Sequence, residues 1–401
     1  MSSSAARAAV PPPEPPDSPG AATADGGLRF DRNELSGAFG DLGTDLPLLV
    51  GMVLAAGLDA PSVLVMFGAM QVATGLAYRM PMPVQPLKAV AALVITQKVP
   101  ATTLYGGGLA IGVTMLVLAA TGMLGWLARV VPRAVVRGLQ FGLGLQLSLL
   151  ALRDMVPSGG VAGYALAAAA FAIVLMLLGN RRWPPAPLVV ALGVAWALWF
   201  AVRPVELVAG IGFTLPAPRT VGWADVTAGF VALALPQVPL SLGNSVLATR
   251  QLAADLFPDR PPLAVRHIGL TYAAMNLVAP WFGGVPTCHG SGGMAGHWAM
   301  GGRTGGSVVL YGIFWLVLGL FFGGAFTTIV QVFPRPVLGV LLVVEGLTLL
   351  LLARDLAAPE LGLAVLVGLV AATLPNGYLV AMVLGVALHP LVRRGRLQFG
   401  R

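Results

Sequence analysis

Residues 80–98, MPMPVQPLKAVAALVITQK, lead from a proline-broken run into a short apolar segment with a lysine near its start. Proline is favoured at the first position of a helix, where its missing N–H costs no hydrogen bond, so we expect a helix that begins at Pro86. The apolar part is shorter than the roughly twenty residues that a helix needs to cross a hydrocarbon core. This stretch is therefore expected to form a half-length helix.

The rest of the chain is dominated by longer apolar segments. Of its 401 residues 57% are apolar and 10% are charged, whereas soluble domains carry about 25% charged residues. The composition disfavours a soluble enzyme and indicates an all-α protein that crosses the lipid bilayer many times. We expect fourteen transmembrane segments, of which the third and tenth are short. Their approximate bounds are 33–57, 61–78, 86–98, 103–127, 133–152, 160–179, 186–202, 223–248, 264–282, 288–301, 304–330, 335–352, 357–372 and 375–392.

The basic residues give the orientation. The net charge is +8, but Lys and Arg are scattered between apolar segments and form no nucleic-acid-binding stripe. If the N-terminus is cytoplasmic, eighteen basic residues lie inside and five outside, so both termini are expected in the cytoplasm. The Pro-, Ala- and Ser-rich residues 1–27 are predicted to be a disordered tail, and residues 393–401 a basic cytoplasmic tail.

The two halves of the chain resemble each other. VVPRAVVRG (130–138) followed by LLALRDM (149–155) returns as VFPRPVLG (332–339) followed by LLLARDL (350–356), with an offset near 202 residues. We expect two repeats of seven segments. Because seven is odd, the second repeat crosses the membrane in the opposite sense to the first, as in many secondary transporters.

The first repeat should span residues 28–202 and the second 203–392. Each contains one broken segment, which is MPMPVQP (80–86) in the first repeat and GGVPTCHGSGG (283–293) in the second. The two segments lie at matching distances before the Pro-Arg pairs of VVPRAVVRG and VFPRPVLG. Broken segments at matching places in inverted repeats indicate a binding site near the middle of the membrane. Two facing helix starts supply roughly one positive charge, which suits a dianion.

The broken segments supply most of the candidate substrate ligands. Lys88 would lie in the first turn of its helix, where a cation makes most sense beside a bound anion; alternatively it reaches an interface or pairs with a carboxylate of the first segment. Glycines of the second segment would let its backbone approach the ligand. The candidates are Gln85, Pro86, Lys88, Thr287, Cys288, His289 and Gly290.

A third group of polar residues lies in PQVPLSLGNSV (236–246). Gln237, Ser241 and Asn244 share one helical face by their spacings of four and three. Their amide and hydroxyl donors could replace the hydration of an oxyanion without adding proton chemistry. The alternative is hydrogen bonding between helices of the bundle.

Carboxylates inside the membrane are candidates for proton coupling. Glu34, Asp41 and Asp45 lie on one face of the first segment, and we favour Asp41 because it lies at membrane depth. Alternatively Asp41 is permanently ionised and paired with Lys88, and Glu34 only caps the helix. Glu345, alone in the twelfth segment, either pairs with a neighbouring Arg or takes part in transport.

No cofactor or metal site is expected. His289 and His297 are eight residues apart and belong to no metal-binding signature, and the single cysteine excludes an intramolecular disulfide. The Gly138/Gly142 pair is read as close helix packing. An intramembrane enzyme would need a nucleophile or metal cluster, and only the isolated Cys288–His289 pair is present.

Four stretches resemble the molybdate transporter family, a branch of the sulfate permease superfamily found in plants and bacteria. They are NELSGAFGDLGTDLPLL (33–49), PMPVQPLKAVAA (81–92), PQVPLSLGNSV (236–246) and GGVPTCHGSGGMAGHW (283–298). The resemblance, which runs from about residue 30 to 392, implies a seven-plus-seven fold like that of uracil permease. Segments 1–4 and 8–11 would form a core domain and segments 5–7 and 12–14 a gate domain.

The resemblance also implies that the substrate lies between the half-helices of segments 3 and 10, and that the protein is a homodimer through its gate domain in a bacterial inner membrane. The chain stops nine residues after its last segment, so the regulatory STAS domain of sulfate permeases is not expected, which favours molybdate. Moving a dianion inward against about 100 mV costs roughly 2 × 2.3 kcal/mol, so proton-coupled uptake is predicted.

Three other transport functions stay open. A sulfate or bicarbonate carrier fits the same residues, because nothing in the sequence measures the radius of the anion. An anion channel would share the fold. A nucleobase permease is disfavoured, since those proteins usually place a carboxylate in segments 8 and 10, where this chain has Gln237 and His289.

Overall fold

The computed structural model describes residues 27–177, 185–374 and 376–397 and is helical apart from two short strands. The tail predicted for residues 1–27 therefore lies almost wholly outside the described residues, as does the end of the basic tail at 398–401. The helices of the first half are α1 (Arg32–Ala38), η1 (Phe39–Asp41), α2 (Leu42–Ala56), α3 (Ala60–Tyr78), α4 (Lys88–Gln97), α5 (Ala101–Ala120), α6 (Met123–Val130), α7 (Arg133–Leu150), η2 (Ala151–Met155), α8 (Gly160–Leu177) and α9 (Pro185–Phe200).

The second half begins with the short helix α10 (Pro204–Ala209). Its other helices are α11 (Trp223–Gly229), η3 (Phe230–Ala234), α12 (Leu235–Leu240), η4 (Ser241–Leu247), α13 (Ala248–Leu256), α14 (Val265–Val278), η5 (Ala279–Phe282), α15 (Ser291–Ala299), α16 (Gly306–Val332), α17 (Arg335–Leu351), η6 (Leu352–Asp355), α18 (Ala358–Thr373) and α19 (Gly377–Arg393). The strands are β1 (Gln85–Pro86) and β2 (Thr287–Cys288).

Turn and capping residues fix where the first helices begin and end. The Asp31 carboxylate accepts hydrogen bonds from the backbone N–H groups of Asn33 and Glu34 and so caps α1. Gly57, with φ 63°, ends α2 in the left-handed conformation that glycine adopts readily. Asp59 then caps α3, with Pro61 in its first turn. The chain therefore reverses between α2 and α3 over a few residues.

Within the described residues, each of the fourteen expected segments contains a helix, and eight stretches are long and apolar enough to cross a membrane. Four further apolar helices are shorter, α4 among them. The expected all-α membrane fold is confirmed. Two bounds were wrong: the fourth segment ends at Ala120, where Gly122 starts the separate helix α6, and the eighth runs on to Leu256.

The two broken segments meet. β1 pairs antiparallel with β2, Gln85 opposite Cys288 and Pro86 opposite Thr287, and the Leu87 N–H donates to the Pro286 carbonyl at 3.0 Å. The prediction that Pro86 opens a helix is wrong, because this pairing holds Pro86 in extended backbone and α4 begins two residues later. Both short helices, α4 and α15, thus start at one point inside the protein.

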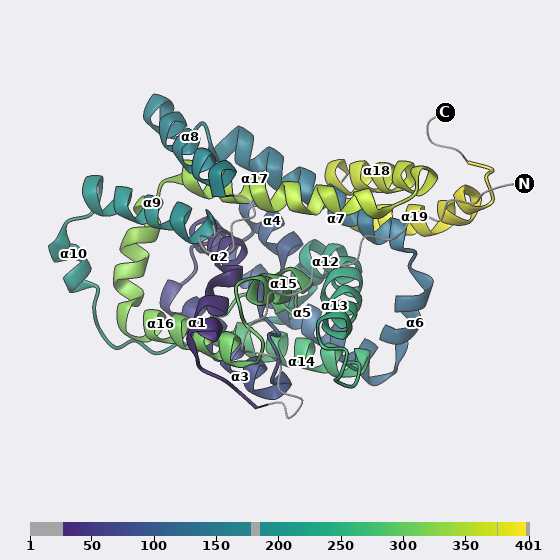
Figure 1. Cartoon of the computed structure of the whole chain (residues 1–401), viewed down its shortest axis with the longest axis horizontal. Helices are drawn as coiled ribbons and strands as arrows, with labels where there is room; N and C mark the ends of the chain where they lie inside the picture. Colours follow the sequence, from purple (N-terminus) through teal and green to yellow (C-terminus); the bar gives the residue numbers. More distant parts are fainter. Residues whose placement is uncertain (1–26, 178–184, 375, 398–401) are drawn as a thin grey trace, which may run out of the picture.

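Figure 1 shows α7, α17, α18 and α19 in a layer along the top of the view, with α4 between this layer and the helices around α2, α12 and α15. Glycines permit the closest contacts. A side chain at Gly138 or Gly142 would lie 2.7 and 2.6 Å from carbonyl oxygens of α18, so the predicted packing role of this pair is confirmed. Gly68 of α3 and Gly312 of α16 approach each other in the same way.

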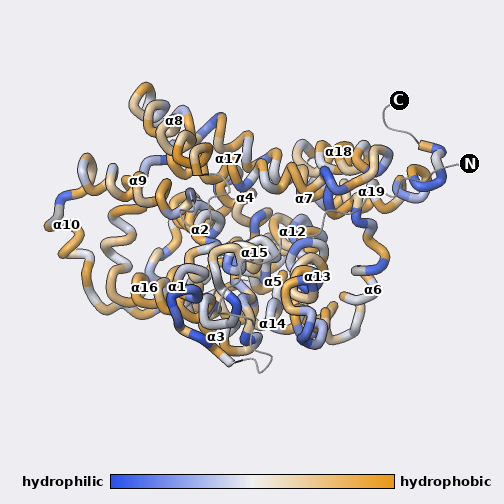
Figure 2. The backbone as a smooth tube through the Cα atoms, in the orientation of Figure 1, coloured by the Kyte–Doolittle hydropathy of each residue, from blue (hydrophilic) through white to orange (hydrophobic). Residues whose placement is uncertain are grey.

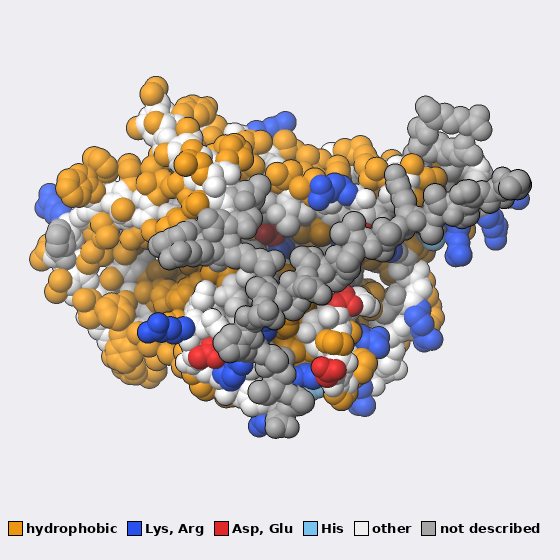
Figure 3. All heavy atoms as spheres, in the orientation of Figure 1, with side chains coloured by type: hydrophobic (Ala, Val, Ile, Leu, Met, Phe, Trp, Pro, Cys, Tyr) orange, Lys and Arg blue, Asp and Glu red, His pale blue; other side chains and the backbone are white. Residues whose placement is uncertain are grey.

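The outer surface is apolar. Figure 2 shows α8, α16 and α17 mostly in the hydrophobic colours, and on the face in Figure 3 hydrophobic side chains cover the upper and left parts. Met176, Trp199 and Trp223 are each at least 80% exposed. Large apolar side chains on this scale are stable against lipid and not against water, so the chain is an integral membrane protein.

Candidate functional site

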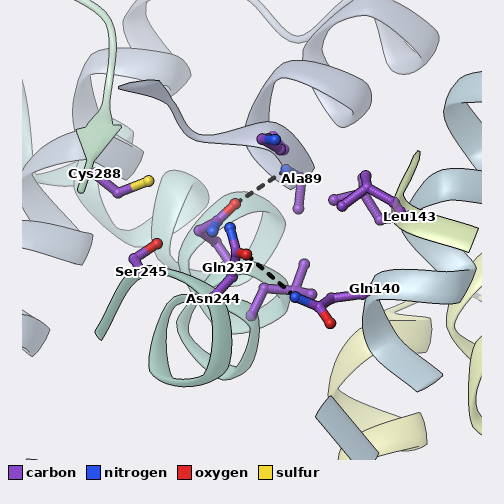
Figure 4. Close-up of a pocket in the computed structure, with 10 residues that line it drawn as sticks. Ala89, Gln140, Leu143, Gln237, Asn244, Ser245 and Cys288 are labelled. Atoms are coloured by element: carbon purple, nitrogen blue, oxygen red, sulfur yellow. Dashed lines mark hydrogen bonds between the residues drawn. The ribbon is translucent and has the colours of Figure 1, made fainter. Parts of the chain in front are cut away.

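A small cavity lies at the point where α4 begins. It is lined by residues of α4, α7, α12, η4, β2 and α17, namely Lys88, Ala89, Gln140, Leu143, Gln237, Leu240, Asn244, Ser245, Cys288 and Leu349. Figure 4 shows Gln237, Asn244 and Ser245 converging on it from one wall and Gln140 from another. The space open to the centre of a water molecule is about 20 Å³, room for about one water. A larger ligand therefore needs side chains to move.

The start of α4 is capped from another helix. Leu87 at the N-cap has no side chain that can accept a hydrogen bond. Instead the Gln237 Oε1 accepts hydrogen bonds from the N–H groups of Ala89 at 3.1 Å and Val90 at 3.3 Å, the first of which is drawn in Figure 4. These donors would otherwise be unsatisfied at a helix start. An amide oxygen thus lies where the first helical N–H groups could meet an anion.

Lys88 lies in the first turn of α4, as predicted; it is the first residue of the helix, and its side chain lines the cavity. It contacts the carboxylate of Glu345 on α17, and the other Glu345 oxygen accepts a hydrogen bond from Thr44 Oγ1 at 3.1 Å. The structure contradicts the alternative in which Lys88 pairs with Asp41, and it also contradicts the pairing of Glu345 with an arginine. Both alternatives were wrong because Lys88 and Glu345 lie 257 residues apart, and the sequence does not indicate which distant residues come into contact.

The start of α15 is built from glycine. Gly290 is its N-cap and has no side chain, and Gly292 and Gly293 lie in its first turn. A Cβ atom at Gly290 would lie 1.5 Å from Gln85 Oε1, and one at Gly293 would lie 2.2 Å from Asp41 Oδ2. Close approach of these two side chains therefore requires glycine at both positions.

The three carboxylates of the first segment differ in their partners. Gln85 Nε2 donates to both oxygens of Asp41 at 2.7 Å, and Tyr311 donates to Asp45 Oδ2 at 3.1 Å. Glu34 is fully buried and accepts from the backbone N–H groups of Arg303, Thr304 and Ser307 at 2.9–3.0 Å. It organises the loop before α16, while Asp31 caps its own helix. The alternative in which Glu34 only caps α1 is therefore wrong.

Gln237 and Ser241 share a face, because Gln237 Nε2 donates to Ser241 Oγ at 3.1 Å, but the three residues Gln237, Ser241 and Asn244 do not all line the cavity. Residues 241–247 form a π-helix, so the spacing of three residues between Ser241 and Asn244 does not place them as it would in an α-helix. Gln237 and Asn244 line the cavity, whereas the Ser241 hydroxyl bonds to Tyr272 at 2.8 Å and lies outside its lining. π-helical turns are frequent at functional sites.

The second broken segment contributes less side-chain chemistry than its composition indicates. Cys288 lines the cavity. Thr287 is held by backbone hydrogen bonds with Asn276, and His289 bonds to Thr271 Oγ1 at 2.8 Å and to the Pro83 carbonyl at 3.1 Å. Thr287, His289 and Gly290 are buried beside the cavity without lining it. Gln85 and Pro86 likewise lie behind its wall.

Gln140 lines the cavity but was not among the residues predicted from the sequence. Its Nε2 donates to Asn244 Oδ1 at 3.2 Å, and its Oε1 accepts from Arg137 at 3.0 Å. Arg137 is in turn paired with Asp355 at 2.5 Å. An amide two residues after Gly138, inside an apolar segment, was the available signal. This chain of contacts fixes which side of the Gln140 amide faces Asn244.

A family model described as the molybdate transporter of the MFS superfamily matches residues 33–147 and 229–349, which hold every cavity-lining residue. The chain belongs to the molybdate transporter family. Molybdate transporter 2 of Arabidopsis thaliana is 33% identical over 82% of this chain and 80% of its own length. Molybdate transporter 1 of Chlamydomonas reinhardtii is 29% identical over 88% of this chain and 91% of its own length. Members of this family are transporters and not enzymes.

Solved structures share the fold of this family member. SLC26A9 matches with a TM-score of 0.66 and 16% identity over 92% of this chain, which spans 66% of the length of that protein. The transmembrane domain of the cyanobacterial bicarbonate transporter BicA matches with a TM-score of 0.62 and 18% identity, covering 86% of this chain and 98% of that domain. The fold is therefore that of a helical anion-transporter membrane domain.

Proposed function

We propose that the protein is a secondary transporter of molybdate. The observation that carries this is the cavity where Lys88, the start of α4 and several uncharged amide groups converge in a chain of the molybdate transporter family. The start of α15 lies close by, since a Cβ atom at Gly292 would be 4.0 Å from Lys88 Nζ. Helix starts and a lysine attract an anion, and amides can hydrogen-bond its oxygens without demanding a proton. The curated relatives are named as molybdate transporters.

In this proposal the bound anion takes the place of the Gln237 oxygen at the N–H groups of Ala89 and Val90. Lys88 supplies the charge, and the amides of Gln140 and Asn244 and the Ser245 hydroxyl complete the cavity wall. The backbone N–H groups at the start of α15, which no side chain caps, supply the second helix start. Both would act on the same anion because β1 and β2 hold the two starts together.

We further infer the seven-plus-seven inverted repeat, with fourteen spans and core and gate domains as the resemblance implies. The strand register supports it: in two repeats offset by about 202 residues, Gln85 corresponds to Thr287 and Pro86 to Cys288, yet Gln85 pairs with Cys288 and Pro86 with Thr287. Crossed pairing of equivalent residues is what a two-fold axis between the repeats requires. The layer of α7 and α17–α19 in Figure 1 corresponds to the gate.

Proton coupling is assigned in this proposal to Asp41, with Asp45 beside it. Both are buried, and Asp41 lies against the start of α15 and Gln85, close to the cavity. In proteoliposomes Asp41→Asn should abolish uptake driven by an inward proton gradient and leave molybdate exchange measurable. Accumulation by the variant that keeps the wild-type dependence on external pH would contradict the assignment.

The setting of the transporter is proposed from the charge bias and the resemblance. Both termini lie in the cytoplasm of a bacterial inner membrane, and two copies associate through the gate domain. Helix α8 of that domain supports the pairing, because it is apolar and only 22% of it is buried within one copy. Native mass spectrometry from lipid at several concentrations should find the dimer; a monomer throughout would contradict it.

Substrate choice is tested by equilibrium binding to the purified protein. Molybdate should bind to the wild type and should be displaced by sulfate only at higher concentration. Equal displacement by sulfate, or tighter binding of bicarbonate, would reassign the substrate within the same fold. Reversal-potential recordings test the mode of transport: passive anion current without proton dependence would identify a channel.

A further inference from the structure

Glu345 is the one acidic residue of α17, whose other residues after Arg335 are uncharged. Its side chain is 12% exposed, and that of Lys88 is 9% exposed. An ionised carboxylate is costly in such surroundings unless it is paired and hydrogen-bonded. Here one oxygen contacts Lys88 and the other accepts from Thr44. Both oxygens are therefore satisfied by residues of α4 and α2, while the carboxylate itself belongs to α17.

The backbone of α17 next to Glu345 packs against a different helix, α7. Gly346 packs so closely on α7 that a side chain there would lie 2.7 Å from the Gly144 carbonyl oxygen, and Gly144 approaches the Gly346 carbonyl in the same way. Leu349, one turn after Glu345, lines the cavity. Glu345 thus reaches from α17, which packs on α7, to the cation at the cavity, and the ion pair joins α17 to α4.

A carboxylate oxygen and an oxyanion oxygen bind an ammonium group in the same way, so they compete for it. Glu345 is attached to the protein, so its effective concentration at Lys88 is high. We propose that Glu345 is a tethered competitor of the transported oxyanion, one that occupies Lys88 in the substrate-free protein and leaves it when the anion binds. This inference rests on the function proposed above.

Two consequences follow from charge. A dianion gains more from Lys88 than a monovalent anion does, so it displaces Glu345 more readily. Once the dianion is bound, the released carboxylate is repelled by it, because charges interact strongly away from water. Substrate binding therefore weakens the side-chain contacts that Glu345 of α17 makes with Lys88 of α4 and Thr44 of α2.

The test is molybdate binding to the purified full-length protein, measured by titration calorimetry in lipid nanodiscs. Glu345→Gln should bind molybdate about tenfold more tightly than the wild type, within the usual range of coupling between two sites. Glu360→Gln is the matched control, because Glu360 lies on α18, 38% exposed and away from the cavity; it should bind as the wild type does.

A variant of Lys88 tests whether Glu345 acts on molybdate binding through this lysine. In a Lys88→Gln background, Glu345→Gln should bring no further gain, because the competitor has lost its site. Thr44→Val removes only the hydrogen bond to Glu345 and should tighten binding by a smaller factor, so it tests the idea even if Glu345→Gln folds poorly. Unchanged or weaker binding by Thr44→Val and Glu345→Gln, or an equal gain without Lys88, overturns the proposal. If the wild type itself binds no molybdate, the proposed function fails instead.

Discussion

The starts of α4 and α15 meet in one place but are built differently. The start of α4 carries a lysine and is closed by the Gln237 side chain, which accepts from two of its N–H groups. The start of α15 has no side-chain cap; it consists of glycine and serine and lies against Gln85 and Asp41. One start therefore presents side-chain charge to the cavity, and the other presents bare backbone beside a carboxylate.

This difference indicates that the two helix starts have different roles. At α4 the side chains decide how strongly an anion is held, so substitutions there should change affinity. At α15 the absence of side chains decides whether the two starts can approach at all, so substitutions there should change folding as well.

The largest expected effect is at α15. Gly293→Ala places a methyl group 2.2 Å from Asp41 Oδ2 and 2.7 Å from Pro83, so we expect a loss of stability of about 1–3 kcal/mol and loss of transport. Gly292→Ala is the matched control, because its new methyl group would meet nothing nearer than Lys88 Nζ at 4.0 Å. Thermal unfolding and uptake of both variants decide this; equal behaviour would show that glycine is not required for packing at 293.

A smaller effect, confined to binding, is expected at Lys88. Lys88→Gln removes the charge at the cavity and should weaken molybdate binding by about 1.5–3 kcal/mol, the usual value of a hydrogen bond to a charged group. Lys98→Gln removes the lysine that caps the opposite end of α4, and should leave affinity unchanged. If both variants bind as the wild type does, Lys88 is no ligand of the anion.

The smallest effect is expected at the cap. Gln237→Ala leaves the N–H groups of Ala89 and Val90 without their acceptor and should cost about 1 kcal/mol of stability in the absence of anion. Saturating molybdate should restore most of this loss, because the anion takes the place of the amide oxygen.

Ser291→Ala at the uncapped start of α15 is the control for Gln237→Ala and should change neither stability nor its response to molybdate. Thermal unfolding with and without molybdate compares the two. A stability loss in Gln237→Ala that molybdate leaves uncorrected would argue that the anion does not bind at these N–H groups.

The sequence by itself determined the helical membrane fold, the short third and tenth segments and the family. Membrane-spanning segments can be predicted from the local sequence, because each apolar run must be long enough by itself to cross the hydrocarbon core. The broken motifs at 81–92 and 283–298 are also visible in the local sequence. The position of Lys88 at the start of its helix followed from the same local reasoning.

Only the tertiary structure decided which side chains share the cavity. The pairing of Lys88 with Glu345 joins residues far apart in the chain, and the short strand β1, which needs β2 as its partner, moved the start of α4 past Pro86. Asn244, within the π-helix after Leu240, lines the cavity, whereas Ser241 bonds to Gln237 and Tyr272. Spacing within one segment predicts a face only for a regular helix, and it carries no information on which distant helix supplies the partner.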